Sequence, residues 1–111
     1  MAFRIQDRRV DDASILAMSG RLTIGDAVSL LSGSIAKRIE AGDRNIVLDM
    51  RHLDYVDSSG LGAIVTALTS TRSHGGTLRL ANVPQRIQNL LDVSSLYMIF
   101  QIIELAEPAA E

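Results

Sequence analysis

The stretch from Asn45 to Ser73, NIVLDMRHLDYVDSSGLGAIVTALTSTRS, decides the fold of this chain. It begins with the apolar and β-branched run from Asn45 to Met50, which is typical of a strand buried on both faces. Apolar side chains then follow at the i, i+3, i+4, i+7 spacing of a helix, at Leu61, Ile64, Val65 and Leu68. We therefore predict a strand over 45–50, a polar loop, and a helix over 60–73.

The loop from Asp54 to Gly60 carries polar side chains immediately before the predicted helix. Ser58 and Ser59 are residue types that cap a helix, whose first backbone N–H groups have no partner within the helix. Gly60 and Gly62 leave the first turn with little steric cover. We therefore predict a helix start that a modifying enzyme or a partner protein can reach.

The segments before this stretch predict two strands and a helix. Apolar runs at 3–10 and 14–18 are separated by Asp11-Asp12, a pair suited to a tight turn, so they predict an antiparallel hairpin. Asp26 is placed to cap the helix that follows, and Gly42 is placed to end it.

The segments after this stretch continue the alternation of strands and helices. We predict a strand over 77–81, a short helix with Pro84 at its first position that ends near Val93, and a closing strand over 100–105. The apolar side chains of this short helix that we expect to face the core are Ile87, Leu90 and Leu91. We assign 1–106 to a single domain and expect 107–111, which contains Pro108, to be a disordered tail.

This order of elements predicts an α/β fold with a mixed β-sheet. The opening hairpin supplies an antiparallel pair, and each later strand–helix–strand segment supplies a parallel β-α-β unit. A chain of 111 residues is long enough to bury one substantial apolar core without disulfides or a structural metal.

The order of sequence motifs resembles that of the STAS family, the sulfate-transporter and anti-sigma-factor-antagonist domains. The resemblance lies in DSSGLG at Asp57–Gly62 after LDMRHLDYV, in the earlier Gly20-Arg21-Leu22, and in GGTLRLAN from Gly75 to Asn82. It implies helices mainly on one face of the sheet. STAS domains usually add a helix after the last strand, for which few residues remain here, so we expect that helix to be short or absent.

The resemblance also implies a function in transcription regulation by partner switching. Free-standing antagonists bind an anti-sigma factor that is an ATP-binding serine kinase, and a phosphatase reverses the phosphorylation. The phosphorylated residue of the family is the serine before the motif glycine, which is Ser59 here, with Ser58 as the alternative. The expected partner surface is the start of the helix, namely Asp57, Ser58, Ser59, Gly60 and Leu61. Asp57 is equally well explained as a turn or capping carboxylate.

Two other kinds of function are compatible with parts of the sequence. The first is a non-switching STAS adaptor or scaffold subunit of a stress-signalling or lipid-transport complex, in which the serines only begin a helix. The second is an enzyme or nucleotide-binding protein. Gly60-Leu61-Gly62 lacks the third glycine of a dinucleotide fingerprint, because Val65 stands in its place. Phosphate-loop and nucleophile-elbow motifs are also absent, so we predict no catalysis and no cofactor.

Composition excludes several other partners. The net charge is −2, from 11 basic and 13 acidic residues spread along the chain, so we predict no direct nucleic-acid binding. There is no cysteine, and His52 and His74 stand apart from other metal-ligating residues, so we predict no metal site. No apolar run approaches the roughly 20 residues that span a bilayer, and the N-terminal residues do not form a signal segment. We therefore expect a cytoplasmic protein without membrane insertion.

Overall fold

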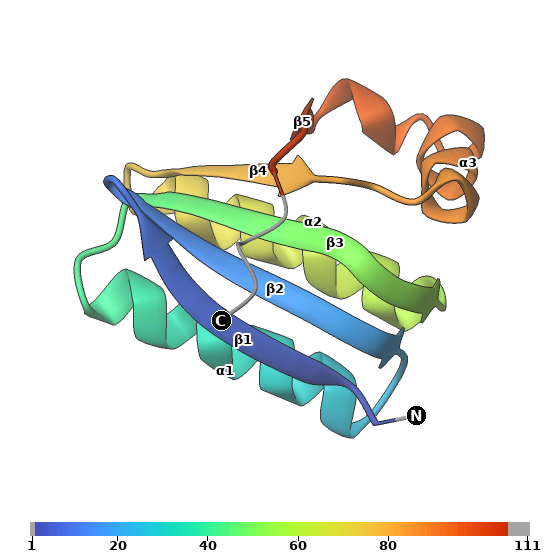
Figure 1. Cartoon of the computed structure of the whole chain (residues 1–111), viewed down its shortest axis with the longest axis horizontal. Coiled ribbons are helices and arrows are strands. Elements are labelled where there is room, and N and C mark those ends of the chain that lie inside the picture. Colours follow the sequence, from blue (N-terminus) through green and yellow to red (C-terminus); the bar gives the residue numbers. More distant parts are fainter. Residues whose placement is uncertain (1, 107–111) are drawn as a thin grey trace.

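The computed structural model describes residues 2–106, which form a five-stranded sheet with helices beneath it (Figure 1). The predicted tail at 107–111 lies outside the described residues. The elements, in chain order, are β1 (Arg4–Val10), β2 (Ala13–Leu22), α1 (Asp26–Glu40), β3 (Asn45–Val56), α2 (Ser58–Ser73), β4 (Thr77–Ala81), α3 (Gln85–Val93), the 3-10 helix η1 (Leu96–Met98) and β5 (Gln101–Ile103).

The strands lie in the order β1-β2-β3-β4-β5, so every strand is beside its neighbour in sequence. β1 and β2 are antiparallel, and the three later pairs are parallel. Crossover connections between parallel strands are right-handed. Each of the three crossovers here leads to the next strand on the same side, so all three place their helices on the same face of the sheet. Figure 1 shows α1 and α2 together beneath the sheet, with α3 beyond the end of β4. The predicted mixed sheet with helices mainly on one face is confirmed.

The main apolar core lies between the sheet and the helices. β3 contributes Ile46, Leu48 and Met50, each fully buried, to this core. Because successive side chains of a strand point to opposite faces, the burial of Val47 and Asp49 between them confirms the prediction of a strand enclosed on both faces. The helices contribute other fully buried side chains to the same core, among them Leu31, Ile64, Ile87 and Leu91. This core holds the N-terminal ends of the helices at one end of the sheet.

A smaller apolar cluster lies on the opposite face, where Ile103 and Leu105 pack against Ile15 and Val47. Polar side chains hold the residues after β5 on this face through hydrogen bonds. The Asn82 side chain accepts a hydrogen bond from the Leu105 N–H (2.9 Å) and donates one to Asp49 Oδ1 (3.1 Å). The Arg51 guanidinium donates to the Leu105 carbonyl oxygen. The residues after β5 therefore cover part of the face that carries no helix.

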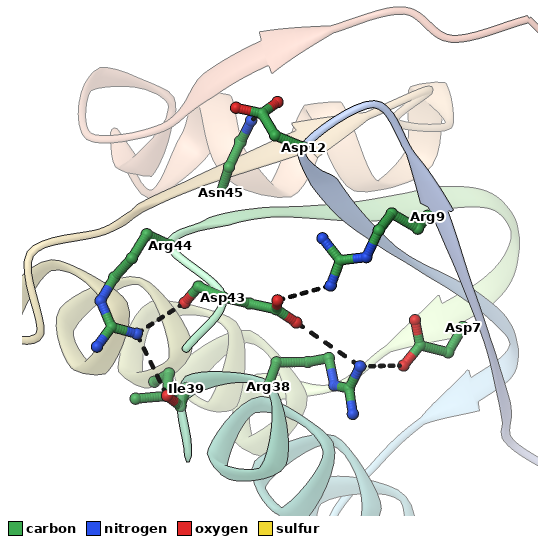
Figure 2. A network of polar contacts seen from close by, with 8 residues as sticks. All are labelled: Asp7, Arg9, Asp12, Arg38, Ile39, Asp43, Arg44 and Asn45. Atoms are coloured by element: carbon green, nitrogen blue, oxygen red, sulfur yellow. Dashed lines mark hydrogen bonds and ion pairs between the residues drawn. The ribbon is translucent and has the colours of Figure 1, made fainter. Parts of the chain in front are cut away.

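Ion pairs join the first strand to the turn after α1 (Figure 2). Asp43 lies 2.6 Å from a guanidinium nitrogen of Arg9 and 3.6 Å from one of Arg38. Arg38 also reaches Asp7, at 3.3 Å. Because Asp43 follows α1 whereas Asp7 and Arg9 lie on β1, the network fastens the edge strand to the helical layer.

Several predicted details near the helix ends are wrong. Gly25, and not Asp26, is the N-cap of α1, and no side chain caps that helix. Pro84 is the N-cap of α3, where its carbonyl oxygen accepts from the N–H groups of Ile87 and Gln88. Leu90 is exposed, because the buried stripe of α3 is formed by Ile87 and Leu91. The closing strand is limited to Gln101–Ile103.

Candidate functional site

The link between β3 and α2 is a single residue, Asp57. The prediction that the strand ends at Met50 is wrong, because β3 runs on to Val56 beside an equally extended β2, with Arg21 opposite Tyr55 and Leu22 opposite Val56. Register shifts in this pair interrupt the simple alternation of inward and outward side chains. Of the residues expected to form a loop, 51–56 are therefore strand, and Ser58 and Ser59 already belong to α2.

Asp57 is the N-cap of α2 and also binds the neighbouring loop. One carboxylate oxygen, Oδ1, accepts from the Gly60 N–H at 2.7 Å, and the other, Oδ2, accepts from the Ile24 N–H at 3.0 Å. The Asp57 N–H itself donates to the Leu22 carbonyl oxygen at 3.2 Å. The backbone N–H groups of Ile24 and then Gly60 hold the pKa of Asp57 below its ordinary value, so it is ionised at neutral pH.

The two serines are therefore not the caps that we predicted. Asp57 occupies the N-cap position, and Ser58 and Ser59 take the first two positions of the helix. Ser58 is exposed and Ser59 is half-buried. Within residues 2–106, neither hydroxyl makes a hydrogen bond. Both hydroxyl groups thus remain available for chemistry at the positive end of the helix dipole.

Gly60 holds the start of α2 against the end of β2. It is buried, and a Cβ atom at this position would lie 2.2 Å from the Leu22 carbonyl oxygen and 2.9 Å from Leu22 Cγ. The expectation of an open first turn is therefore wrong for Gly60, because backbone fills the space beside it. It is correct for Gly62, where a Cβ atom would meet nothing within 4 Å. The close contact between Gly60 and Leu22 fixes how near the first turn of α2, which carries both serines, lies to the end of β2.

The five residues predicted to bind a partner make up the cap and first turn of α2 but differ in exposure. Ser58 is exposed, whereas Asp57, Ser59 and Leu61 are half-buried and Gly60 is buried. Leu61 packs partly against the main core. The surface that a partner can touch through these residues is therefore narrow, and neighbouring loops must contribute the rest.

Sequence reasoning missed the neighbouring apolar and cationic side chains. Ile24, whose backbone is bound by Asp57, is 75% exposed, and Leu30 on α1 is also exposed. The Arg21 guanidinium lies over the Tyr55 ring, 4.4 Å from its centroid. The motif Gly20-Arg21-Leu22 marked this region, but only the fold shows that it lies beside Asp57. We refer to Ile24, Leu30 and Tyr55, together with the first turn of α2, as the switch surface.

Within residues 2–106, no group of three or more histidine, aspartate or glutamate side chains is arranged to hold a metal ion. No helix in the same residues has the length and apolar character needed to cross a membrane. The sheet also lacks a point where the crossovers reverse direction, which is where open α/β sheets bind nucleotides.

Comparison with known proteins identifies the family of this fold. Residues 4–108 match the family described as the STAS domain, and the chain belongs to this family. It is 31% identical, over 90 residues, to a Paenibacillus polymyxa protein named anti-sigma F factor antagonist, covering 79% of this chain and 75% of that protein.

Solved structures show the same fold. The crystal structure of the Thermotoga maritima protein TM1081 superimposes with a TM-score of 0.83 at 26% identity, covering 91% of this chain and 86% of that one. The Bacillus cell-fate determinant SpoIIAA, solved in its phosphorylated form, has a TM-score of 0.73 at 20% identity, covering 96% of this chain and 93% of that one.

Proposed function

We propose that this protein is an anti-sigma factor antagonist whose partner binding is switched off by phosphorylation of Ser59. The unmodified chain binds an anti-sigma factor that is itself an ATP-binding serine kinase, and a phosphatase restores the unmodified form. The observation that carries this proposal is the start of α2, where two serine hydroxyls stand unbonded beside an anchored carboxylate, Asp57. The cytoplasm is the compartment where such a switch acts on transcription.

The comparisons support the role but not the individual residues. A relative above 30% identity is named an anti-sigma F factor antagonist, and a structural neighbour of this fold was solved in a phosphorylated form. Phosphorylation is thus a property of that neighbour, and the resemblance of DSSGLG to the family motif carries it to Ser59. Ser58, which is more exposed, is the alternative acceptor.

The geometry explains how one phosphoryl group would prevent binding without unfolding the chain. The Ser59 hydroxyl attacks the γ-phosphorus of ATP in the kinase, ADP leaves, and the hydroxyl proton passes to a base of the kinase. The product adds a charge of about −1.5 to −2 near the positive end of the α2 dipole, which the fold tolerates. It also stands beside the ionised Asp57, so a partner with acidic or apolar groups here meets repulsion and a desolvation cost.

A paired capture experiment tests the proposed function. Unmodified protein and the Ser59→Glu variant are used as baits in lysate of the source cell, and captured proteins are identified by mass spectrometry. We expect an ATP-binding serine kinase with the first bait and not with the second. Thr66→Glu is the matched control, because it adds the same charge at an exposed position further along α2.

The remaining outcomes separate the rival functions. Retention of the same components by both baits would show a non-switching adaptor and would refute the switch. Site-resolved mass spectrometry of protein phosphorylated by the captured kinase then decides between the two serines. Modification of Ser58 alone would overturn the assignment of Ser59.

A further inference from the structure

The two edges of the sheet differ in charge. The outer strand β1, with the sequence RIQDRRV, carries Arg4, Asp7, Arg8 and Arg9. At the other edge, no charged residue occurs from Val93 to Ile103, a segment that contains η1 and β5. Charged side chains on an edge strand prevent it from pairing with another strand. The β1 edge is therefore protected against association, whereas the β5 edge is not.

Exposed apolar side chains gather along the same segment. Six of the ten exposed large apolar side chains in residues 2–106 lie between 90 and 102, and Val93 and Met98 are 87% and 72% exposed. A cluster of this kind marks an interaction site on a soluble protein. We refer to these six residues as the β5-edge surface: Leu90, Val93, Tyr97, Met98, Ile99 and Ile102.

The backbone of β5 presents unpaired groups on its outer side. Among residues 2–106, β4 is the only strand paired with β5, and the Asn82 N–H donates to the Ile103 carbonyl oxygen at 3.0 Å. Successive residues of a strand direct their backbone groups to opposite sides. Because the Ile103 carbonyl points toward the β4 side, the N–H and C=O of Ile102 point outward, away from the sheet.

We propose that the β5-edge surface binds a second copy of this chain, with the two β5 strands antiparallel about a two-fold axis at Ile102. In this arrangement each Ile102 exchanges both backbone hydrogen bonds with its copy, as in a hydrogen-bonded pair of an antiparallel sheet. The exposed side chains of η1 and the end of α3 then pack across the axis. The result is a continuous sheet through both copies.

A second copy fits this surface because the surface is complementary to itself. A two-fold contact places the same residues opposite each other, so any charge would face a like charge. The segment from Val93 to Ile103 carries none, which removes this repulsion between the two paired strands. The Arg72 guanidinium, which donates to the Ile99 carbonyl oxygen at 3.2 Å, lies beside this segment. None of the six residues belongs to the switch surface, so Ser59 stays accessible in the dimer.

Sedimentation velocity tests this proposal. The contact is small compared with stable interfaces, so we expect a dissociation constant on the order of 10 µM. Over roughly 5 to 500 µM protein, a range that brackets this value, the sedimenting mass should rise from one chain toward two. A single-chain mass over the whole range would overturn the proposal.

Matched variants at the two edges identify the interface. Ile102→Lys, at the proposed axis, should remain a monomer, whereas Val10→Lys, at an exposed apolar position of β1, should dimerise like the unmodified chain. Dimerisation of Ile102→Lys with unchanged affinity would contradict the proposal. Val93→Glu should weaken dimerisation at least about tenfold, and it cannot disturb the core because this side chain is 87% exposed.

Amide hydrogen exchange supplies a measurement that needs no substitution. The Ile102 N–H should exchange slowly at high protein concentration and rapidly at low concentration, because the copy gives it a partner that the described part of its own chain does not. A dimer in which the Ile102 amide exchanges equally fast at both concentrations would rule out pairing of the β5 strands.

Discussion

Asp57 organises the site at the scale of single residues. Its two carboxylate oxygens bind N–H groups from two different segments, Gly60 in α2 and Ile24 in the loop before α1. The carboxylate therefore caps one helix and also holds the backbone of the loop that carries the exposed Ile24. Its depressed pKa reflects these bonds, because both stabilise the ionised form.

The lowered pKa of Asp57 predicts a dependence of stability on pH. A carboxyl whose pKa is lower in the folded state stabilises the fold above its unfolded pKa, and this contribution is lost as the pH falls through the folded pKa. The ordinary pKa is 3.8, so the unmodified protein should melt a few degrees above Asp57→Asn at neutral pH. The gap should shrink between about pH 5 and pH 2. A gap in melting temperature that stays constant through this range would show that Asp57 does not act through its charge.

Gly60 and Gly62 form a matched pair for testing the contact between α2 and β2. Gly60→Ala should lower the free energy of unfolding by about 2–4 kcal/mol, because its Cβ atom would lie 2.2 Å from a backbone oxygen. Gly62→Ala has free space and should raise it by about 0.5–1 kcal/mol. Urea unfolding measures both values, and similar effects for the two variants would refute the packing argument.

At this scale the sequence predicted that Asp57, Ser58 and Ser59 stand at the start of a helix, but not the position that each one takes there. A polar residue before a helix predicts an N-cap, and three such residues, Asp57, Ser58 and Ser59, are consecutive in the sequence. The serines were the wrong choice, because the cap is set by where β3 ends. The bond from Asp57 to Ile24 spans 33 residues of sequence, and no local pattern encodes it.

At the scale of elements, the contacts of Asn82 hold the chain after β5 on the open face of the sheet. This residue follows β4 with a positive φ of 54° and joins the buried Asp49 to the Leu105 backbone. Asparagine suits both tasks, since it adopts left-handed backbone more readily than most residues and its amide donates and accepts at once.

Replacing Asn82 should therefore destabilise the protein in two separable ways. Asn82→Ala removes both hydrogen bonds and strains the backbone, and we expect a loss of about 2–4 kcal/mol in the free energy of unfolding. Asn82→Gly removes the same bonds without the strain and should be less harmful by about 1 kcal/mol. Chemical denaturation checks both values. Variants within about 0.5 kcal/mol of the unmodified protein would mean that these contacts contribute little.

Element types were predictable from the sequence, whereas several boundaries were not. The predicted strands and helices are present in the predicted order, because their apolar spacing reflects burial in the main core. β3 extends six residues beyond the predicted end at Met50, since its continuation is set by pairing with β2 and not by its own composition. Leu90 was expected in the core, but on a nine-residue helix one small rotation exposes a side chain at the margin of the buried stripe.

At the scale of the whole molecule, the regular strand order gathers the starts of the helices at one end of the sheet. All crossovers step in one direction, so α1, α2 and α3 begin at the same end of the sheet, where β2 and β3 also end. This end presents loops and helix N-termini, whereas Asp43 and its ion pairs follow the C-terminal end of α1, at the opposite end of that helix. In the function that we propose, this end of the sheet is the part of the chain that the kinase contacts.

The most direct test compares the affinity of two homogeneous proteins for the captured kinase, one unmodified and one carrying phosphoserine at position 59. Titration calorimetry with a non-hydrolysable ATP analogue prevents turnover during the measurement. We predict binding of the unmodified chain and an affinity at least about tenfold lower for the phosphorylated chain, a difference of roughly 1.4 kcal/mol. Equal affinities of the two proteins would contradict the switch at Ser59.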